Sequence, residues 1–223
     1  MTRTSSLLGA VSSIVLVALS ASPAFAEGTD AGTPITNSVS VSFQVNGITQ
    51  VAQADTDEFL VDRKVNLTVV ETGGTATLVT PGSINQVTTF SVTNLSNDVV
   101  DLALSVAQQS GGGAAAFTGN DNFNTGAVKF YIDTDGTAGY SVGDTEVTYL
   151  DGVGTDDSVT VYAVTSIAVA RVNGDIATVV LTATAYNGST ACSLGALLTT
   201  SATNAVSGVD TVLADAAGST DAQ

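Results

Sequence analysis

Apolar and polar residues alternate along most of this chain, and that period of two constrains the fold more than any other feature. Successive side chains of a strand point to opposite faces, so the alternation is typical of strands with one buried face. No helical periodicity occurs before residue 190. The strands predicted in this way cover residues 39–45, 48–54, 59–69, 88–92, 100–106, 128–133, 145–150, 159–163 and 177–185.

Turn-forming residues separate these segments. Asn46-Gly47 stands between two of them and is the dipeptide that best supplies positive φ in a tight hairpin. The three prolines, Pro23, Pro34 and Pro81, lie outside strand interiors, as a hydrogen-bonded ladder requires. The sequence therefore predicts an all-β, Ig-like β-sandwich of about nine or ten strands.

The first 26 residues have the organisation of a secretory signal peptide. Arg3 precedes an apolar run from Leu7 to Leu19, and Ala24-Phe25-Ala26 matches the Ala-x-Ala cleavage pattern. A membrane anchor is the alternative, but the apolar run is short for one and no charged segment follows it. We therefore expect a secreted protein, extracellular or at the cell surface, without a membrane span after cleavage.

Three regions follow from this division of the chain. Residues 1–26 form the signal peptide and residues 27–200 the β-sandwich domain. Residues 201–223 are expected to form a polar C-terminal tail or a terminal strand. Within the end of the chain, residues 191–217 are rich in Ala and Leu but also in Thr, Ser and Gly, and are compatible with a loop, a short helix or a strand.

The chain is strongly acidic, and this limits its partners. Its formal charge is −16, and without Arg3 the remaining four basic and 21 acidic residues give −17. Nucleic acid and anionic lipid both need a basic surface, so we expect neither as a partner. The chain contains no His and no Trp. Ser-His-Asp and Cys-His catalytic arrangements are therefore absent, and stacking sites for sugars are disfavoured.

The segment DTDGTAGYSVGD, residues 133–144, carries the most specific chemical signal. Calcium needs hard oxygen ligands that converge from a short segment, and alternate positions of this one supply them. The candidate ligands are Asp133, Asp135, Thr137, Gly139, Ser141 and Asp144, with Glu146, Asp151, Asp156 and Asp157 as further carboxylates from the next strand and turn. The pattern departs from the EF-hand loop, because Ala138 replaces the glycine at position six and position twelve is Asp. A solvated acidic turn is the alternative interpretation.

Two other features have simple structural interpretations. Asp55, Asp57, Glu58 and Asp62 form a second acidic cluster, which strand-edge charge against aggregation explains. Cys192 is the only cysteine, so no intrachain disulfide can form. Small and apolar neighbours predict that Cys192 is a buried small side chain, with an intermolecular disulfide as the alternative.

Val79-Thr-Pro-Gly82 is followed by Val87-Thr-Thr-Phe-Ser-Val-Thr-Asn94, an alternating strand that ends in Thr-Asn. These two segments resemble the conserved-repeat, Ig-like domain of secreted bacterial surface proteins of alphaproteobacterial type. Residues 31–37, 59–67 and 209–218 are similar to other parts of such proteins. The resemblance implies an Ig-like fold and a structural or surface role, and it brings no catalytic residues with it.

We therefore expect a secreted, non-catalytic structural or surface protein of the bacterial envelope or extracellular matrix. Residues 35–44 could pair with an open sheet edge of a neighbouring molecule and so support self-assembly, or could form an ordinary first strand of their own domain. Other surface proteins are the second class of partner. The alternative function is a calcium-stabilised, adhesin-like binding module for glycan or protein. A third possibility is an enzyme that hydrolyses glycosides with paired carboxylates, but the clustering of the acidic residues in turns disfavours it.

Overall fold

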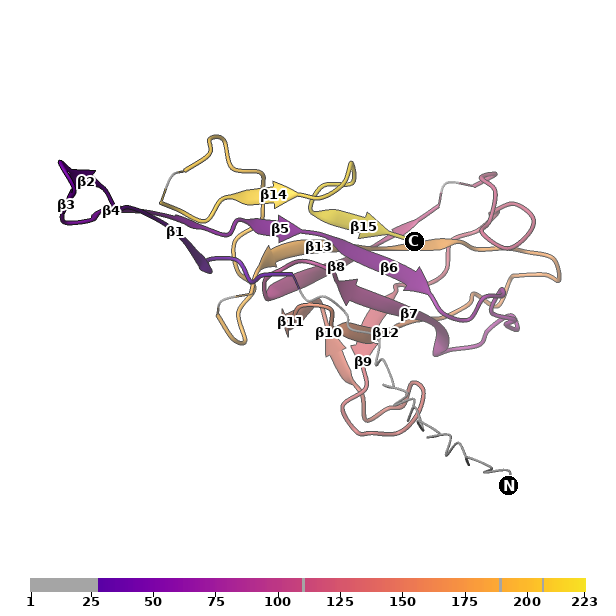
Figure 1. Cartoon of the computed structure of the whole chain (residues 1–223). Helices are drawn as coiled ribbons and strands as arrows, with labels where there is room; N and C mark the ends of the chain where they lie inside the picture. Colours follow the sequence, from indigo (N-terminus) through magenta and orange to yellow (C-terminus); the bar gives the residue numbers. More distant parts are fainter. Residues whose placement is uncertain (1–27, 110, 189, 206) are drawn as a thin grey trace, which may run out of the picture.

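The fold is all-β. The computed structural model describes residues 28–109, 111–188, 190–205 and 207–223, so the predicted signal peptide, residues 1–26, lies outside the described residues. The described part contains fifteen strands and no helix, which is consistent with the β-sandwich class that the alternation predicts (Figure 1). Accordingly, this part offers no helix with the length and apolar character needed to cross a membrane.

Two antiparallel sheets form the body of the molecule. The five-stranded sheet has the order β10 (Thr145–Val147), β9 (Lys129–Ile132), β12 (Ser158–Thr165), β7 (Gln86–Asn94) and β6 (Leu67–Glu71). The four-stranded sheet has the order β11 (Tyr149–Val153), β8 (Val100–Gln108), β13 (Val179–Asn187) and β15 (Thr220–Ala222).

The core lies between the two sheets. Alternate residues of β7 and β13 are buried, as expected for strands with one face inside. Phe90, Val92 and Val161 come from the five-stranded sheet, and Leu102 and Leu181 come from the four-stranded sheet. All five are at most 2% exposed and belong to one apolar cluster. Such burial is the dominant favourable contribution to folding.

The remaining strands form three small pairs. β5 (Arg63–Val65) pairs in parallel with β14 (Thr211–Leu213). β1 (Pro34–Val41) pairs with β4 (Gln53–Leu60), and β2 (Gln44–Val45) pairs with β3 (Ile48–Thr49). β14 and β15 both lie within residues 201–223, for which a tail and a terminal strand were the two expectations.

The strand count is higher than the nine or ten predicted, because several expected strands are divided and because residues 201–223 add β14 and β15. Residues 59–69 contain the end of β4, then β5 and β6, with a break at Asn66, whose backbone bonds to the Ser96 side chain. Residues 145–150 divide at Thr148 into β10 and β11, which belong to different sheets. The alternation of apolar residues continues through both breaks, so periodicity alone does not detect them.

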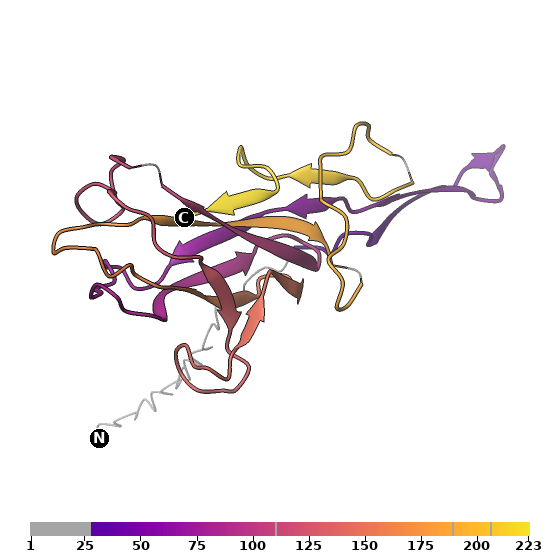
Figure 2. The same cartoon turned by 180° about the vertical axis from the view of Figure 1, so that it is seen from behind.

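The sandwich has two distinct ends, which are opposite each other in Figures 1 and 2. The hairpin of β1 to β4 projects from one end, which we call the arm end. β7 and β12 run antiparallel, with Ser158 paired to Thr93 near the arm end and Thr165 paired to Gln86 at the other. We call that other end the far end; there the loops of residues 72–85, 109–128 and 166–178 connect the strands.

Asn94 fixes the end of β7 at the arm end. Its side chain is fully buried, and its amide nitrogen donates to the carbonyls of Asp98, Val153 and Gly154 at 2.9–3.0 Å. Its Oδ1 accepts from the Ser96 N–H at 2.9 Å. The Thr-Asn end of this strand, which carried part of the family resemblance, is therefore a polar junction that joins three segments of the fold.

Candidate metal centre and projecting hairpin

The acidic segment 133–144 is the loop between β9 and β10. Tyr140 holds this loop against the outer face of the five-stranded sheet. Its ring lies 5.1 Å from the Tyr131 ring and 6.3 Å from the Tyr162 ring, in edge-to-face contacts. Tyr131 and Tyr162 are cross-strand partners on β9 and β12, so both rings stand on one face. This aromatic contact positions the carboxylates of the loop relative to the sheet.

Three of the six predicted ligands come together in space. Asp133, Asp135 and Asp144 each offer a carboxylate oxygen, and these oxygens all lie within 4.8 Å of one another. Gly136 and Gly139 have φ of 75° and 81°, a conformation that glycine adopts without strain, and they let the loop curl back on itself. Positive φ at positions four and seven replaces the sharp turn that an EF-hand places at its sixth residue.

Two of the other predicted ligands, Thr137 and Ser141, support this cluster through hydrogen bonds, whereas Gly139 contributes its positive φ. The Ser141 hydroxyl donates to Asp135 Oδ2 at 2.6 Å, and the Ser141 N–H donates to Asp144 Oδ2 at 2.7 Å. The Thr137 N–H donates to Asp135 Oδ1 at 2.8 Å. The hydrogen bond from the Ser141 hydroxyl, followed by that from Thr137, lowers the pKa of Asp135 below its ordinary value of 3.8. Asp135 is thus held in the ionised form that a cation requires.

Asp144 provides the test of whether these residues fit a cation. It is only 8% exposed, and its Oδ1 is buried without a hydrogen-bond partner, whereas its Oδ2 accepts from Ser141. A buried carboxylate oxygen without a partner is costly, and three carboxylates this close repel one another. A hard divalent cation would give the Asp144 Oδ1 a partner and would offset the repulsion between the carboxylates, since Ca²⁺ is bound by carboxylate, carbonyl and water oxygens.

Two of the four further carboxylates, Glu146 and Asp151, are engaged in other contacts. The Glu146 carboxylate accepts from Lys129 Nζ at 2.8 Å, and this bond is the main reason why the Glu146 pKa is lowered. Asp151 accepts from the Cys192 N–H at 3.0 Å. The carboxyl cluster found in the described part of the chain consists of the three loop aspartates alone, without Glu146, Asp151, Asp156 or Asp157.

The hairpin of residues 34–60, which we call the arm, is the second candidate site. β1 and β4 pair with each other from Pro34–Leu60 to Val41–Gln53 and form a separate two-stranded sheet (Figure 1). The arm is fixed at its base by backbone bonds between Gly32 and Val61 and between Val61 and Thr33. Residues 35–44 therefore do not form a first strand of the sandwich, which was one of the two interpretations from sequence.

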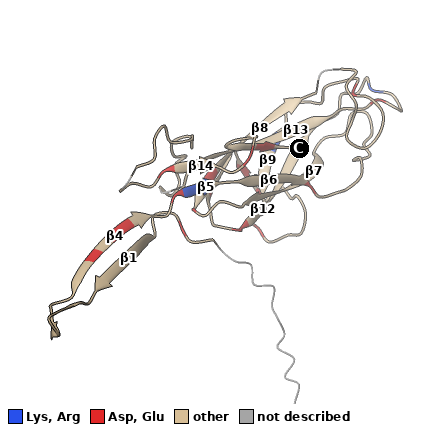
Figure 3. Cartoon of the chain, turned by 45° about the horizontal axis from the view of Figure 1, so that its top comes forward, with Lys and Arg blue, Asp and Glu red and all other residues tan. Residues whose placement is uncertain are grey.

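The outer part of the arm is uncharged and carries exposed apolar side chains among uncharged polar ones. Asn46 and Gly47 have φ of 53° and 79°, as predicted for a tight hairpin turn. Val45 and Ile48 flank this turn and are 51% and 67% exposed, and Val51 is 82% exposed. Residues 34–54 contain no Lys, Arg, Asp or Glu, and the carboxylates of the arm lie on β4 (Figure 3). An exposed apolar patch of this kind is typical of an interaction surface.

Cys192 corrects another expectation from the sequence. It is exposed and has a free thiol, with φ of 58°, instead of being a buried small side chain. Its N–H bonds to the Asp151 carboxylate, so the backbone conformation of this turn brings the side chain to the surface. Local composition did not reveal this, because the small neighbours of Cys192 lie in a surface turn instead of a strand.

Comparison with known proteins gives no further guide to the site. No family model matches the chain, and neither a curated protein nor a solved structure matches it.

Proposed function

We propose that this protein is a secreted, non-catalytic structural subunit that self-associates through its arm. The observation that carries the proposal is the arm itself, a two-stranded sheet that projects from the sandwich with exposed Val45, Ile48 and Val51 at its end. A two-stranded hairpin alone is marginally stable in water, and exposed apolar residues on it cost free energy until a partner covers them. Strand addition to a neighbouring sheet is a common way to supply that partner.

The Ig-like topology and the resemblance to bacterial surface domains belong to the same proposal. The strand order supports an Ig-like topology, because β6-β7-β12-β9 and β8-β13-β15 can be assigned to the ABED and CFG sheets of an Ig domain, with β10 and β11 as additional edge strands. A projecting arm on an Ig-like body suits a subunit of the bacterial envelope or extracellular matrix. The predicted signal peptide supports export to that location.

The proposal is tested by removing the arm without disturbing its base. Ile35 and Phe59 are paired residues, so replacing residues 36–58 with Asn-Gly closes a short hairpin between them. The mature wild-type chain should form assemblies in analytical ultracentrifugation and electron microscopy, whereas the armless variant should remain monomeric with a similar thermal midpoint. Wild-type particles that stay monomeric across salt and calcium concentrations would refute the proposal.

A second candidate function is a calcium-stabilised binding module for glycan or protein. It is favoured by the buried, unpartnered Oδ1 of Asp144 beside Asp133 and Asp135. Calcium binding is compatible with the structural role as well, because a cation would stiffen the loop and reduce the negative charge of each subunit. A glycan or protein ligand that binds only in calcium, and binds the armless variant equally well, would favour this second function.

A further inference from the structure

We propose that the arm of one molecule binds in a cavity at the far end of the next molecule. The inference rests on the self-association proposed above and names the surface that receives the arm. It follows from four properties of the far end: a cavity, an exposed apolar rim, an incomplete strand edge and a low charge.

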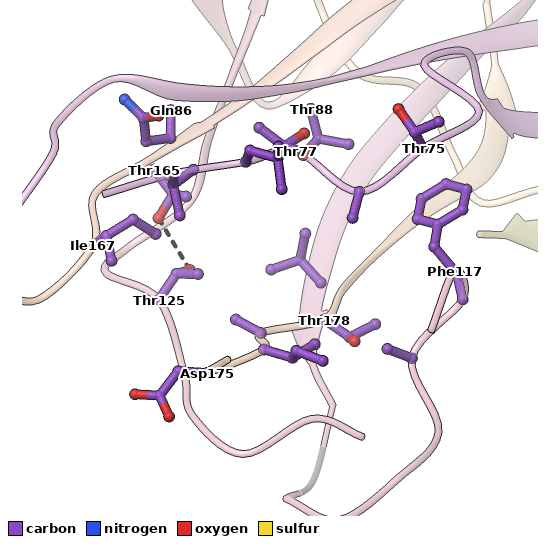
Figure 4. A pocket seen from close by; sticks show the side chains of 18 of the residues that line it. Thr75, Thr77, Gln86, Thr88, Phe117, Thr125, Thr165, Ile167, Asp175 and Thr178 are labelled. Atoms are coloured by element: carbon purple, nitrogen blue, oxygen red, sulfur yellow. Dashed lines mark hydrogen bonds between the residues drawn. The ribbon is translucent and has the colours of Figure 1, made fainter. Parts of the chain in front are cut away.

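The cavity has a volume of about 880 Å³ and lies between the loops of the far end (Figure 4). Its walls are formed by the loop after β6, the start of β7, the loop after β8 and the segment that leads into β13. Thr77, Phe117 and Thr178 lie on different walls of it, as Figure 4 shows. This volume is near the upper end of the range for small-molecule pockets and is large enough for several side chains.

Exposed apolar side chains gather at the two ends of the molecule. Of the twenty large apolar residues that are exposed in the described part, seven lie on the arm. Six others belong to the loops of the far end, and they are Leu78, Val79, Ile84, Phe117, Val169 and Val172. Each of the two patches would cover the other in a contact between copies, which removes both from water.

β7 presents an incomplete edge beside the cavity. On one side of β7, β12 pairs along Gln86–Thr93. On the other side, β6 pairs only with Phe90–Asn94, and the last backbone hydrogen bond there joins the Thr72 N–H to the Thr89 carbonyl. Backbone groups alternate in direction along an antiparallel strand, so Val87 faces the same side as Thr89. Its carbonyl accepts a side-chain hydroxyl, that of Thr77, at 3.4 Å. An incoming strand could extend the sheet at this point.

Charge favours this contact over others between copies. Two molecules that each carry −16 repel one another, so contact is least costly where carboxylates are scarce. Residues 34–54 of the arm contain none. Glu71 and Asp175 are the charged residues of the cavity wall, and both are already bonded, Glu71 to the N–H of Gly74 and Asp175 to that of Val172.

The geometry makes the contact intermolecular. From Pro34 to the turn at Asn46 the arm spans about 40 Å, at roughly 3.3 Å for each residue. It projects away from one end of the sandwich, while the loops that line the cavity lie at the opposite end (Figures 1 and 2). The arm of a molecule therefore cannot fill its own cavity. A contact between two different surfaces of identical subunits is heterologous and continues from one copy to the next, giving filaments or rings.

Disulfide cross-linking between single-cysteine variants tests the contact. In a Cys192→Ser background, Val45→Cys on the arm is mixed with Thr77→Cys in the cavity and oxidised. Val142→Cys serves as the matched control, because Val142 is 93% exposed but lies on the acidic loop at the side of the sandwich. The arm–cavity product should exceed the arm–control product at least tenfold. Equal yields would overturn the proposal.

A cavity variant separates this inference from the proposed function. Phe117→Asp should weaken association at least tenfold without changing the thermal midpoint. Leu194→Asp, which adds the same charge at an exposed position outside the arm, the cavity and the acidic loop, should leave association unchanged. If the armless variant is monomeric but Phe117→Asp associates like wild type, the arm binds elsewhere and only this inference fails. If wild type and the armless variant are both monomeric, both proposals fail. A copurified apolar molecule in the cavity, with association unaffected by Phe117→Asp, would make the cavity a small-molecule site and overturn the inference.

Discussion

At the residue scale, the three loop aspartates are the groups that we expect to respond to calcium. Asp133, Asp135 and Asp144 are close enough to repel one another, and calcium bound only to the folded state must stabilise it by RT ln(1 + [L]/Kd). At ten times Kd this amounts to about 1.4 kcal/mol. We expect millimolar calcium to raise the thermal midpoint of the mature chain relative to chelator, and Asp133→Asn/Asp135→Asn to abolish that rise.

The matched control for this prediction is Asp55→Asn/Asp57→Asn. It removes the same charge from a second exposed acidic pair, on β4. The control variant should keep the full calcium response. If both double variants lose it equally, the response is a general effect of cations on an acidic chain, and the loop is an acidic turn.

The pH dependence of Asp135 follows from its hydrogen bonds. Its pKa is lowered from 3.8, mainly by the Ser141 hydroxyl, so its ionised form contributes stability above the unfolded-state value near pH 4. That contribution is lost as the pH falls through the folded-state pKa. Carboxyl NMR titration should show a pKa below 3.8 for Asp135 in wild type and a higher one in Ser141→Ala. An unchanged pKa in the variant would contradict this assignment.

Asn94 should be one of the most sensitive polar positions in the fold. Asn94→Ala leaves three carbonyls and the Ser96 N–H without their partner, so we expect a loss of about 2–4 kcal/mol in the free energy of unfolding. Thr93→Ala, which removes an exposed hydroxyl contact to Ser158, should cost under about 0.5 kcal/mol. Urea denaturation measures both. A small effect at Asn94 would mean that water replaces its contacts.

Sequence spacing located the loop residues but not the property that makes the loop a candidate cation site. Asp133, Asp135 and Asp144 could be selected because a curled loop brings alternate residues together. The burial of the unpartnered Asp144 oxygen and the contact of Tyr140 with rings from two strands both arise in the folded chain, and residue spacing does not encode them. The exposure of Cys192 and the burial of Asn94 also depend on contacts that are distant in sequence, which local composition does not record.

At the element scale, the arm shows what periodicity can and cannot predict. Asn46-Gly47 between two alternating runs predicted the hairpin, and positive φ at both residues confirms the turn. The alternation did not show that β1 and β4 would pair only with each other, because the pattern of a half-buried strand is the same whether its own sheet or another molecule covers it. A pattern of apolar residues predicts that one face is buried, but it does not identify the segment or molecule that covers this face.

Charge placed on the tip of the arm should prevent association while leaving the sandwich intact. Val45→Lys/Ile48→Lys puts two ammonium groups where the proposed contact is apolar, and burying them is costly. We expect at least a tenfold loss of association in sedimentation velocity, with an unchanged thermal midpoint. The control is Val142→Lys/Leu194→Lys, which adds the same charge at exposed positions outside the arm and the cavity. Equal losses in both variants would attribute the effect to net charge.

At the scale of the whole molecule, net charge opposes association, whereas the proposed apolar contact of the arm favours it. A charge of −16 opposes contact between copies, and salt screens that repulsion over distances of about 10 Å at 0.1 M. An apolar contact is not weakened by salt in the same way. Association should therefore strengthen from 0.05 to 0.5 M NaCl, as measured by the sedimentation coefficient at fixed protein concentration. Dissociation at high salt would indicate that ion pairs, instead of the arm's apolar residues, hold the copies together.

Complementation between two defective subunits tests the head-to-tail account most directly. The armless variant keeps only the cavity, so it can bind the arm of another molecule. The Phe117→Asp variant keeps only a functional arm, which can bind in the cavity of another molecule. Each alone should be monomeric in sedimentation equilibrium, and an equimolar mixture should form a complex of one chain of each, which cannot grow further. A mixture that remains monomeric, while wild type assembles, would contradict the arm-in-cavity contact, and wild type that never assembles would contradict the structural role itself.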